Sequence, residues 1–254
     1  MSKVPVVETA VDAYRFGFRN YPRIFGIVWA PLLLMQLGVV RLFAPLMQSM
    51  QGAVRSHDPS AILGVVGEFL VLELVAFVLL VFISVGITRL ALGRTIRWPF
   101  LLFSLGSDFW RLLAADFLVA LIGFAMAFVL VRLGSLLAPI VLEEKRVSLS
   151  RNWTLTRGNA WRILGVFVLI LLPLVALGIA QMVAMALLGG PNIFVPAVTP
   201  DASMARSVAM MRLFSDYWFI YLPVSLAITP IFYGPLLGVG ALIYRRIAPE
   251  APAS

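Results

Sequence analysis

Long runs without a charged residue constrain this chain more than any other feature of its sequence. The longest covers residues 163–200, and a second covers residues 24–40. An α-helix rises about 1.5 Å per residue, so about 20 apolar residues cross the hydrocarbon core of a bilayer. Only 13% of the 254 residues are charged and 61% are hydrophobic, whereas soluble domains carry about 25% charged residues. The sequence therefore predicts an all-α integral membrane protein and argues against a soluble enzyme.

Charged and polar interruptions divide the apolar sequence into candidate membrane-spanning segments. We expect a single membrane domain over residues 1–254. The apolar stretch 110–142 is too long for one crossing, so we divide it into a tight hairpin with its turn near Gly123. An alternative with five spans treats this stretch as one helix. The six expected spans of the helix bundle are residues 24–47, 61–88, 108–122, 124–142, 161–188 and 217–244.

Basic residues predict the orientation of these spans. Residues 89–97 and 145–162 are both rich in basic side chains, and such segments stay on the cytoplasmic side of bacterial membranes. An even number of crossings then separates them, which favours six spans with both termini in the cytoplasm. The net charge of +8 has the same explanation, so it does not indicate a nucleic-acid partner. Lys3 and Lys145 are the only lysines, and an arginine-dominated composition is typical of GC-rich bacterial genomes.

Residues 6–20 show the periodicity of an amphipathic helix. Apolar residues recur every three or four positions on one face, and charged residues follow the same period on another. Such a helix can lie in the membrane interface, or it can pack as a cytoplasmic helix against the bundle. The apolar positions are Val7, Val11, Tyr14 and Phe18, and the charged positions are Glu8, Asp12, Arg15 and Arg19.

An aromatic residue and an arginine stand at the start of three predicted spans, at residues 21–23, 110–111 and 161–162. Each pattern follows a polar or amphipathic segment. We interpret this as three repeats, each an interfacial helix followed by a transmembrane hairpin. The alternative is that aromatic residues and arginines recur at the inner ends of spans without any repeat.

Glu73, Asp116 and Arg132 are the charged residues expected deepest in the membrane. A charge at that depth costs at least about 2.5–3.5 kcal/mol, so each of them needs a partner or water. Asp116 and Arg132 lie at similar depths on the two arms of the hairpin, so we expect them to form an ion pair. Glu73 is expected to bond inside the bundle. A transporter or channel would use the same three residues to line a pathway.

Anionic lipid headgroups are the expected partners of the basic cytoplasmic segment, residues 145–159, and of the start of the next span. Arginines attract phosphate, and tryptophans anchor at the membrane interface. The candidate residues are Arg146, Arg151, Trp153, Arg157, Trp161 and Arg162.

The sequence contains no recognisable catalytic, cofactor or metal-binding pattern. It has no cysteine, no glycine-rich phosphate loop and no serine–histidine pair, and its one histidine stands beside Asp58 in a polar segment. We therefore expect no enzyme activity, no cofactor and no bound metal.

Residues 131–164 combine three motifs. These are Arg-Leu at 132–133, Ala-Pro at 138–139 followed by Glu143, and the run Ser-Leu-Ser-Arg-Asn-Trp-Thr-Leu-Thr-Arg-Gly-Asn-Ala-Trp-Arg at 148–162. This stretch resembles the bacterial YciC-like membrane proteins and the membrane domain attached to some glycerophosphodiester phosphodiesterases. The resemblance implies a six-helix inner-membrane protein whose biochemical role is poorly defined. The soluble phosphodiesterase barrel is missing from the sequence, so its activity is not carried over.

These features favour a non-enzymatic, multi-pass protein of the bacterial inner membrane. It would support envelope or lipid homeostasis, or act as an accessory subunit of a membrane complex. Its expected partners are anionic lipids, other membrane proteins or further copies of itself. The alternative is a small transporter or channel that uses Glu73, Asp116 and Arg132. A lipid-modifying membrane enzyme is disfavoured because the catalytic pattern is missing.

Overall fold

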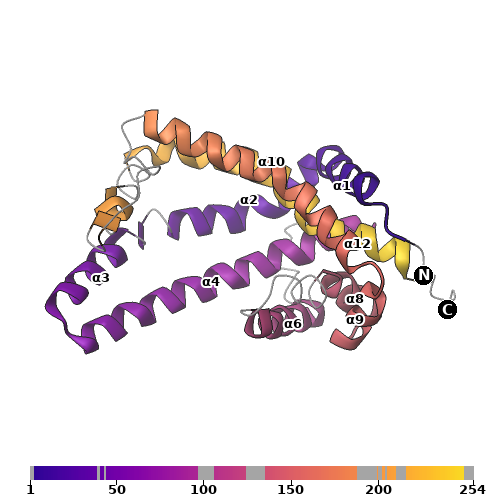
Figure 1. Cartoon of the computed structure of the whole chain (residues 1–254), viewed down its shortest axis with the longest axis horizontal. Helices are drawn as coiled ribbons and strands as arrows, with labels where there is room; N and C mark the ends of the chain where they lie inside the picture. Colours follow the sequence, from indigo (N-terminus) through magenta and orange to yellow (C-terminus); the bar gives the residue numbers. More distant parts are fainter. Residues whose placement is uncertain are drawn as a thin grey trace. The chain divides into compact units, whose positions relative to one another are not determined.

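Helices form all the regular structure in the part of the chain that the structure describes (Figure 1). This computed structural model describes residues 3–38, 41–42, 44–96, 106–123, 135–187, 199, 202–203, 205–209 and 216–248. The helices, in chain order, are α1 (Val6–Arg19), α2 (Tyr21–Gly38), α3 (Ala44–Ser56), α4 (Pro59–Ala91), α6 (Ser107–Gly123), α8 (Leu137–Glu144), α9 (Leu149–Thr156), α10 (Ala160–Leu187) and α12 (Trp218–Ile247).

Three of the described helices are long and apolar enough to cross a membrane. They are α4, residues Ala160–Ala180 of α10, and α12. Their positions match the spans predicted at residues 61–88, 161–188 and 217–244. The regular structure of the described residues is therefore all-helical, and these three helices agree with a membrane-embedded protein, while the count of six spans stays a prediction.

Within residues 24–47, where the sequence predicted one span, the structure describes α2 up to Gly38 and α3 from Ala44. α3 also occupies most of the polar segment 48–60, which lies between the first two expected spans. Leu46 and Ala53 are seven positions apart and both are buried, so they lie on one packed face of α3. Packing of this face stabilises the helix, although the polar composition of the segment does not predict one.

A short turn joins α3 to α4. Asp58 precedes Pro59, the first residue of α4, and its Oδ1 atom accepts hydrogen bonds from the backbone nitrogen and the hydroxyl of Ser60, at 2.9 and 2.7 Å. An aspartate before a proline is a favoured start for a helix, because proline has no N–H to leave unpaired in the first turn.

The predicted hairpin over residues 108–142 is described in part. α6 ends at Gly123, where the turn was expected, and residues 124–134 lie outside the described part of the chain. The arm expected at 124–142 is visible as α8, whose Leu137, Ile140 and Leu142 are fully buried. This end of the arm packs against protein rather than presenting an apolar face outward.

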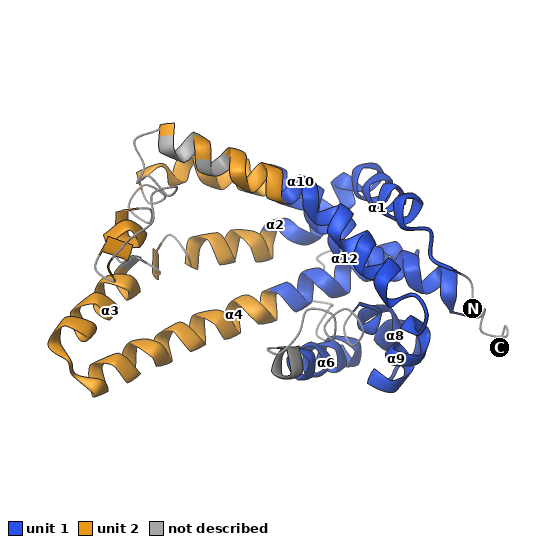
Figure 2. Ribbon diagram, in the orientation of Figure 1, with its two compact units in different colours: residues 1–29, 80–174, 228–254 blue, residues 30–79, 175–227 orange. Residues whose placement is uncertain are grey.

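The chain forms two compact units (Figure 2). Unit 1 contains residues 1–29, 80–174 and 228–254, and unit 2 contains residues 30–79 and 175–227. The four helices α2, α4, α10 and α12 each contribute to both units. Neither unit is a continuous stretch of sequence, so each forms only when distant segments come together.

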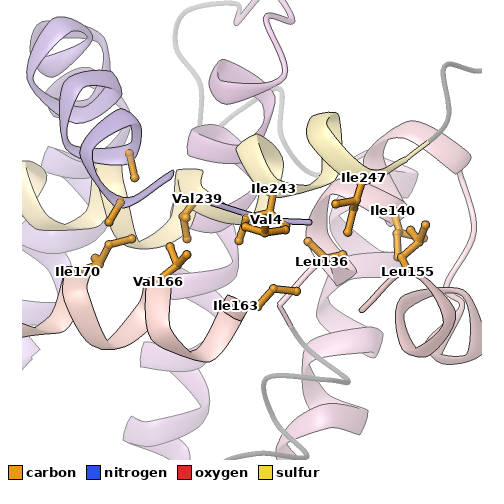
Figure 3. Packing of buried hydrophobic residues seen from close by; sticks show 12 residues of the cluster. Val4, Leu136, Ile140, Leu155, Ile163, Val166, Ile170, Val239, Ile243 and Ile247 are labelled. Atoms are coloured by element: carbon orange, nitrogen blue, oxygen red, sulfur yellow. The ribbon is translucent and has the colours of Figure 1, made fainter. Parts of the chain in front are cut away.

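A continuous apolar core holds unit 1 together (Figure 3). It joins the N-terminal segment, α1, α8, α9 and the unit 1 parts of α10 and α12. Burying one large aliphatic side chain contributes about 1.5–3 kcal/mol. The core residues are Val4, Ala10, Ala13, Leu136, Ile140, Leu155, Ile163, Val166, Ile170, Val239, Ile243 and Ile247.

Glycines bring α1 close to α12 in unit 1. A Cβ atom added at Gly17 would lie 2.7 Å from Cδ of Pro235, and one at Gly238 would lie 2.6 Å from the ring of Phe16. Real Cβ atoms essentially never approach other atoms so closely. Glycine at these two positions therefore permits the contact between the two helices.

Polar contacts fix the N-terminal segment to α10. The backbone N–H of Val4 donates to Oδ1 of Asn159 at 3.0 Å, and Arg162 donates to the Val4 carbonyl at 3.4 Å. Further along, the hydroxyl of Tyr14 donates to the carbonyl of Ile170 at 2.7 Å. The start of the chain is thus held along the first turns of α10.

Unit 2 contains its own polar contact between distant segments. The side-chain amide of Gln36 on α2 donates to the hydroxyl of Ser225 on α12 at 3.0 Å. Side-chain hydrogen bonds of this kind stabilise the pairing of helices in an apolar surrounding, here the pairing of α2 with α12.

The close approach at Gly17 yields a first prediction. Gly17→Ala is expected to destabilise the protein by about 1–3 kcal/mol, because the added methyl group overlaps the Pro235 ring. Thermal unfolding of the protein in detergent measures this. Gly67→Ala on α4 is the matched control, because no heavy atom lies within 4 Å of its added Cβ. Equal unfolding temperatures for the two variants would contradict the packing described.

Candidate functional site

Charged residues are distributed unequally between the two units. The described basic residues of unit 1 are Lys3, Arg15, Arg19, Arg23, Arg89, Arg94, Arg111, Lys145, Arg146, Arg151, Arg157, Arg162, Arg245 and Arg246. Its described acidic residues are Glu8, Asp12, Asp108, Asp116, Glu143 and Glu144. The described charges of unit 2 are Arg41, Arg55, Arg206, Asp58, Glu68, Glu73 and Asp216. Unit 1 therefore holds the positive charge of the described chain.

Asp108 ties three segments of unit 1 together. Its carboxylate accepts from Arg89 at 3.1 Å and from Lys145 at 2.6 Å, and Arg111 lies 4.0 Å away. Asp108 is only 7% exposed, and it stands in the first turn of α6, where the helix dipole also favours a negative charge. Because Arg89 belongs to α4 and Lys145 follows α8, one buried carboxylate joins the ends of α4, α6 and α8.

A second group of ion pairs surrounds the end of α8. Glu144 accepts from Arg146 at 2.8 Å and from Arg151 of α9 at 2.9 Å, and the hydroxyl of Tyr244 donates to it at 3.3 Å. Burial alone would raise the pKa of Glu144, but the hydrogen bonds and charges of the two arginines outweigh burial and lower its pKa. Glu144 therefore links α8, α9 and α12 as a carboxylate at neutral pH.

The structure gives the predicted lipid-binding arginines different roles. Arg146 and Arg151 both bind Glu144, and Arg162 donates to a backbone carbonyl. Much of their hydrogen-bonding capacity is therefore used within the protein. The side chain of Arg157 is exposed and binds no residue that the structure describes.

The two predicted interface tryptophans are both exposed. Trp161 at the start of α10 is 72% exposed, and Trp153 on α9 is also exposed. Trp110, at the corresponding position of α6, is exposed as well. Large exposed aromatic side chains beside basic residues are typical of the interface between a membrane and water.

Of the three predicted intramembrane residues, the structure describes Glu73 and Asp116. Glu73 is exposed, and the bond expected for it inside the bundle is not found with any described residue. Asp116 is half-buried in α6. Arg132 lies outside the described residues, so the ion pair expected with Asp116 stays a prediction.

A cavity of about 660 Å³ opens between the start of α2 and the end of α4, within unit 1. Its polar lining combines Asn20, Arg23, Arg94 and Thr95 with an apolar wall. A second, polar recess of about 450 Å³ shares two of these residues, since it is lined by Arg89, Arg94 and Thr95. The remaining residues that line the larger cavity are Pro22, Gly26, Ile27, Leu90, Gly93 and Ile96.

The end of α4 positions two of these polar residues. Gly93 has φ +75°, a conformation that glycine adopts without strain. Its N–H donates to the carbonyl of Leu90 at 3.0 Å, while the N–H of Arg94 donates to Arg89 at 2.9 Å. This hydrogen-bond pattern ends the helix and turns Arg94 and Thr95 toward the cavity. A glycine followed by an arginine at the end of an apolar helix is the sequence signal for this turn, and neither Arg23 nor Arg94 was among the residues predicted to bind lipid.

No protein-family model, curated protein or solved structure matches the chain. The resemblance to YciC-like proteins over residues 131–164 therefore stays a prediction. Within the described ranges, no group of three or more histidine, aspartate or glutamate side chains could hold a metal ion. The chemistry that the described residues do present is a set of arginines beside apolar and aromatic surface.

Removing the Asp108 carboxylate is expected to loosen unit 1. Asp108→Asn should destabilise the protein by about 2 kcal/mol, because it breaks two charge-assisted hydrogen bonds to a buried group. Thermal unfolding in detergent tests this. Glu68→Gln removes an exposed carboxylate and is the control. If both variants unfold at the wild-type temperature, the joining role of Asp108 is wrong.

The lowered pKa of Glu144 predicts a pH dependence. Ionised Glu144 stabilises the folded protein fully at pH values above the ordinary glutamate pKa of 4.5. This stabilisation is lost as the pH falls through the lower pKa that Glu144 has in the folded protein. Glu144→Gln should therefore unfold at a lower temperature than the wild type at pH 7. This difference should shrink as the pH falls below about 4.5. A difference that stays constant from pH 7 to pH 3 would contradict the ionic role of Glu144.

Proposed function

We propose that this chain is a non-enzymatic integral protein of the bacterial inner membrane that binds anionic phospholipids on the basic end of unit 1. That end would face the cytoplasm, with both termini on the same side and six spans in all. The protein would support envelope or lipid homeostasis or act as an accessory subunit of a membrane complex. The observation that carries this proposal is the way α1 presents its apolar face.

α1 packs on unit 1 through small residues, and three of the four residues of its predicted apolar face stay exposed, while the fourth, Tyr14, packs against the core. Ala10, Ala13 and Gly17 are buried against the bundle. Val7, Val11 and Phe18 are 67%, 48% and 61% exposed. Successive helical residues are rotated by about 100°, so this apolar face lies about 120° around the helix from the packed face. An exposed apolar face is suited to the membrane interface. This supports an interfacial position for α1 over the alternative, in which a cytoplasmic helix would pack its apolar face against the bundle.

The acidic residues of α1 are neutralised by the protein itself. Arg246 of α12 binds Asp12 at 2.6 Å and Glu8 at 3.1 Å, and it donates to the hydroxyl of Thr9 at 3.3 Å. These contacts hold α1 beside the basic end of α12. They also remove the repulsion that two free carboxylates would exert on an anionic headgroup.

The ends of the long helices support the orientation. Arg89 ends α4, Arg162 begins α10, and Arg245 and Arg246 end α12, and all of them belong to unit 1. Because Arg89 and Lys145 bind the same carboxylate, the segments before and after the hairpin meet in one place. An even number of crossings between them fits this contact, and the positive-inside rule assigns this end to the cytoplasm.

The exposed apolar face of α1 can be tested by site-directed labelling, because the chain has no cysteine. Val11→Cys and Phe18→Cys, each labelled with an environment-sensitive fluorophore, are expected to be quenched by lipids that carry a quencher in their acyl chains. The reason is that both positions face the acyl region in the proposed arrangement.

Arg15→Cys is the matched control, since it lies on the polar face of the same helix and its side chain is 70% exposed. Little lipid quenching is expected at position 15. Equal quenching at positions 11, 15 and 18, or none at any of them, would contradict the interfacial placement of α1.

A further inference from the structure

We propose that the cavity between α2 and α4 binds the headgroup of one anionic phospholipid, with Arg23 and Arg94 as the ligands of its phosphate. This inference rests on the proposed function and gives it a specific site. It also moves the main phosphate contacts away from Arg146 and Arg151, which the sequence favoured and which bind Glu144 instead.

The two arginines of the cavity retain hydrogen-bonding capacity. Arg23 is exposed in the first turn of α2, and its side chain forms no bond with the described part of the chain. Arg94 uses Nε and Nη2 on Glu143, at 3.3 and 2.7 Å, and no described residue accepts from Nη1, whose donors can therefore bind a ligand. Arginine donors match the geometry of phosphate oxygens, so two guanidinium groups lining one cavity suit a phosphate group.

Two neutral polar groups complete the polar side of the cavity. Asn20 donates through Nδ2 to the carbonyl of Phe16 at 2.9 Å, and this leaves Oδ1 as an acceptor. Thr95 is exposed, and it lines both the cavity and the adjoining polar recess. An acceptor beside phosphate donors suits a headgroup that also carries a hydroxyl, as phosphatidylglycerol does.

The apolar wall favours a lipid over a free phosphate ion. Ile27, Leu90 and Ile96 line the same cavity as the arginines. Leu90 lies at the end of α4, a helix apolar enough to cross a membrane, so the cavity stands at the expected boundary between acyl chains and water. A volume of about 660 Å³ is within the usual range of ligand cavities, and basic pockets between membrane helices commonly bind lipid headgroups.

The principal test compares two arginines that differ in position. Native mass spectrometry of the full chain, titrated with phosphatidylglycerol and separately with phosphatidylcholine of the same acyl chains, measures the affinity for each lipid. Arg23→Gln is expected to weaken phosphatidylglycerol binding about tenfold, the effect of losing one charge-assisted hydrogen bond. Arg19→Gln removes the same charge from an exposed position that does not line the cavity, and it should bind like the wild type.

A second pair of variants tests for an increase in the affinity for phosphatidylglycerol. Glu143→Gln releases Arg94 from its ion pair, so phosphatidylglycerol binding should strengthen about fivefold. Glu8→Gln changes the net charge equally on α1, away from the cavity, and should leave the affinity near the wild-type value. Thermal unfolding of each variant confirms that it is folded before the titrations are compared.

The possible outcomes distinguish a failure of the cavity as the lipid site from a failure of the proposed function. Equal weakening by Arg23→Gln and Arg19→Gln, or no effect of Glu143→Gln, would overturn the cavity while leaving a general preference for anionic lipid. Equal affinity of the wild type for the two lipids would overturn both. Displacement of phosphatidylglycerol by millimolar inorganic phosphate would show that the cavity takes a free phosphate ion, and would overturn the lipid assignment.

Discussion

The cost of placing charge in an apolar membrane is the constraint on which the rest of this structure depends. Apart from Glu68 and Glu73 of α4, the charged residues of the long helices α4, α10 and α12 stand near the helix ends. In unit 1 this brings many arginines close together, and they would repel one another without acidic partners. Asp108 and Glu144 provide such partners from the start of α6 and the end of α8. The same ion pairs that balance the charge also join the helices.

The arginines of unit 1 fall into two groups with different consequences. Some are bound by carboxylates or carbonyls of the protein, as Arg89, Arg246 and Arg162 are, and these mainly fix the positions of helices. Others, such as Arg23 and Arg94 at the cavity, have donors that bind no residue in the described part of the chain. Helix α1 adds an exposed apolar face to this basic surface, and exposed tryptophans add aromatic side chains. A surface that combines free guanidinium groups, aromatic rings and apolar side chains matches the chemistry of an anionic membrane interface.

Local sequence patterns predicted the helices that are determined by residues close together in the sequence. The bounds of α1 and the three apolar helices follow from periodicity and hydropathy, because these depend on residues within a few turns. α3 was missed because its polar composition resembles a loop, and its helix is stabilised by packing of Leu46 and Ala53. Pairing of arginines could not be predicted, because Arg94 and Glu143 are brought together only by the fold. The cavity was not predicted for the same reason: its two sides come from residues 20–27 and 90–96, which lie more than 60 residues apart in the sequence.

Hydrogen–deuterium exchange in nanodiscs tests the central claim most directly, because it locates lipid contacts along the whole chain without any substitution. The protein would be compared in nanodiscs of phosphatidylcholine alone and in nanodiscs that also contain phosphatidylglycerol. Binding of anionic lipid at the basic end of unit 1 predicts slower exchange around the start of α2 and the end of α4, and unchanged exchange in α3 of unit 2. Identical exchange in the two membranes, or a change confined to unit 2, would contradict the account.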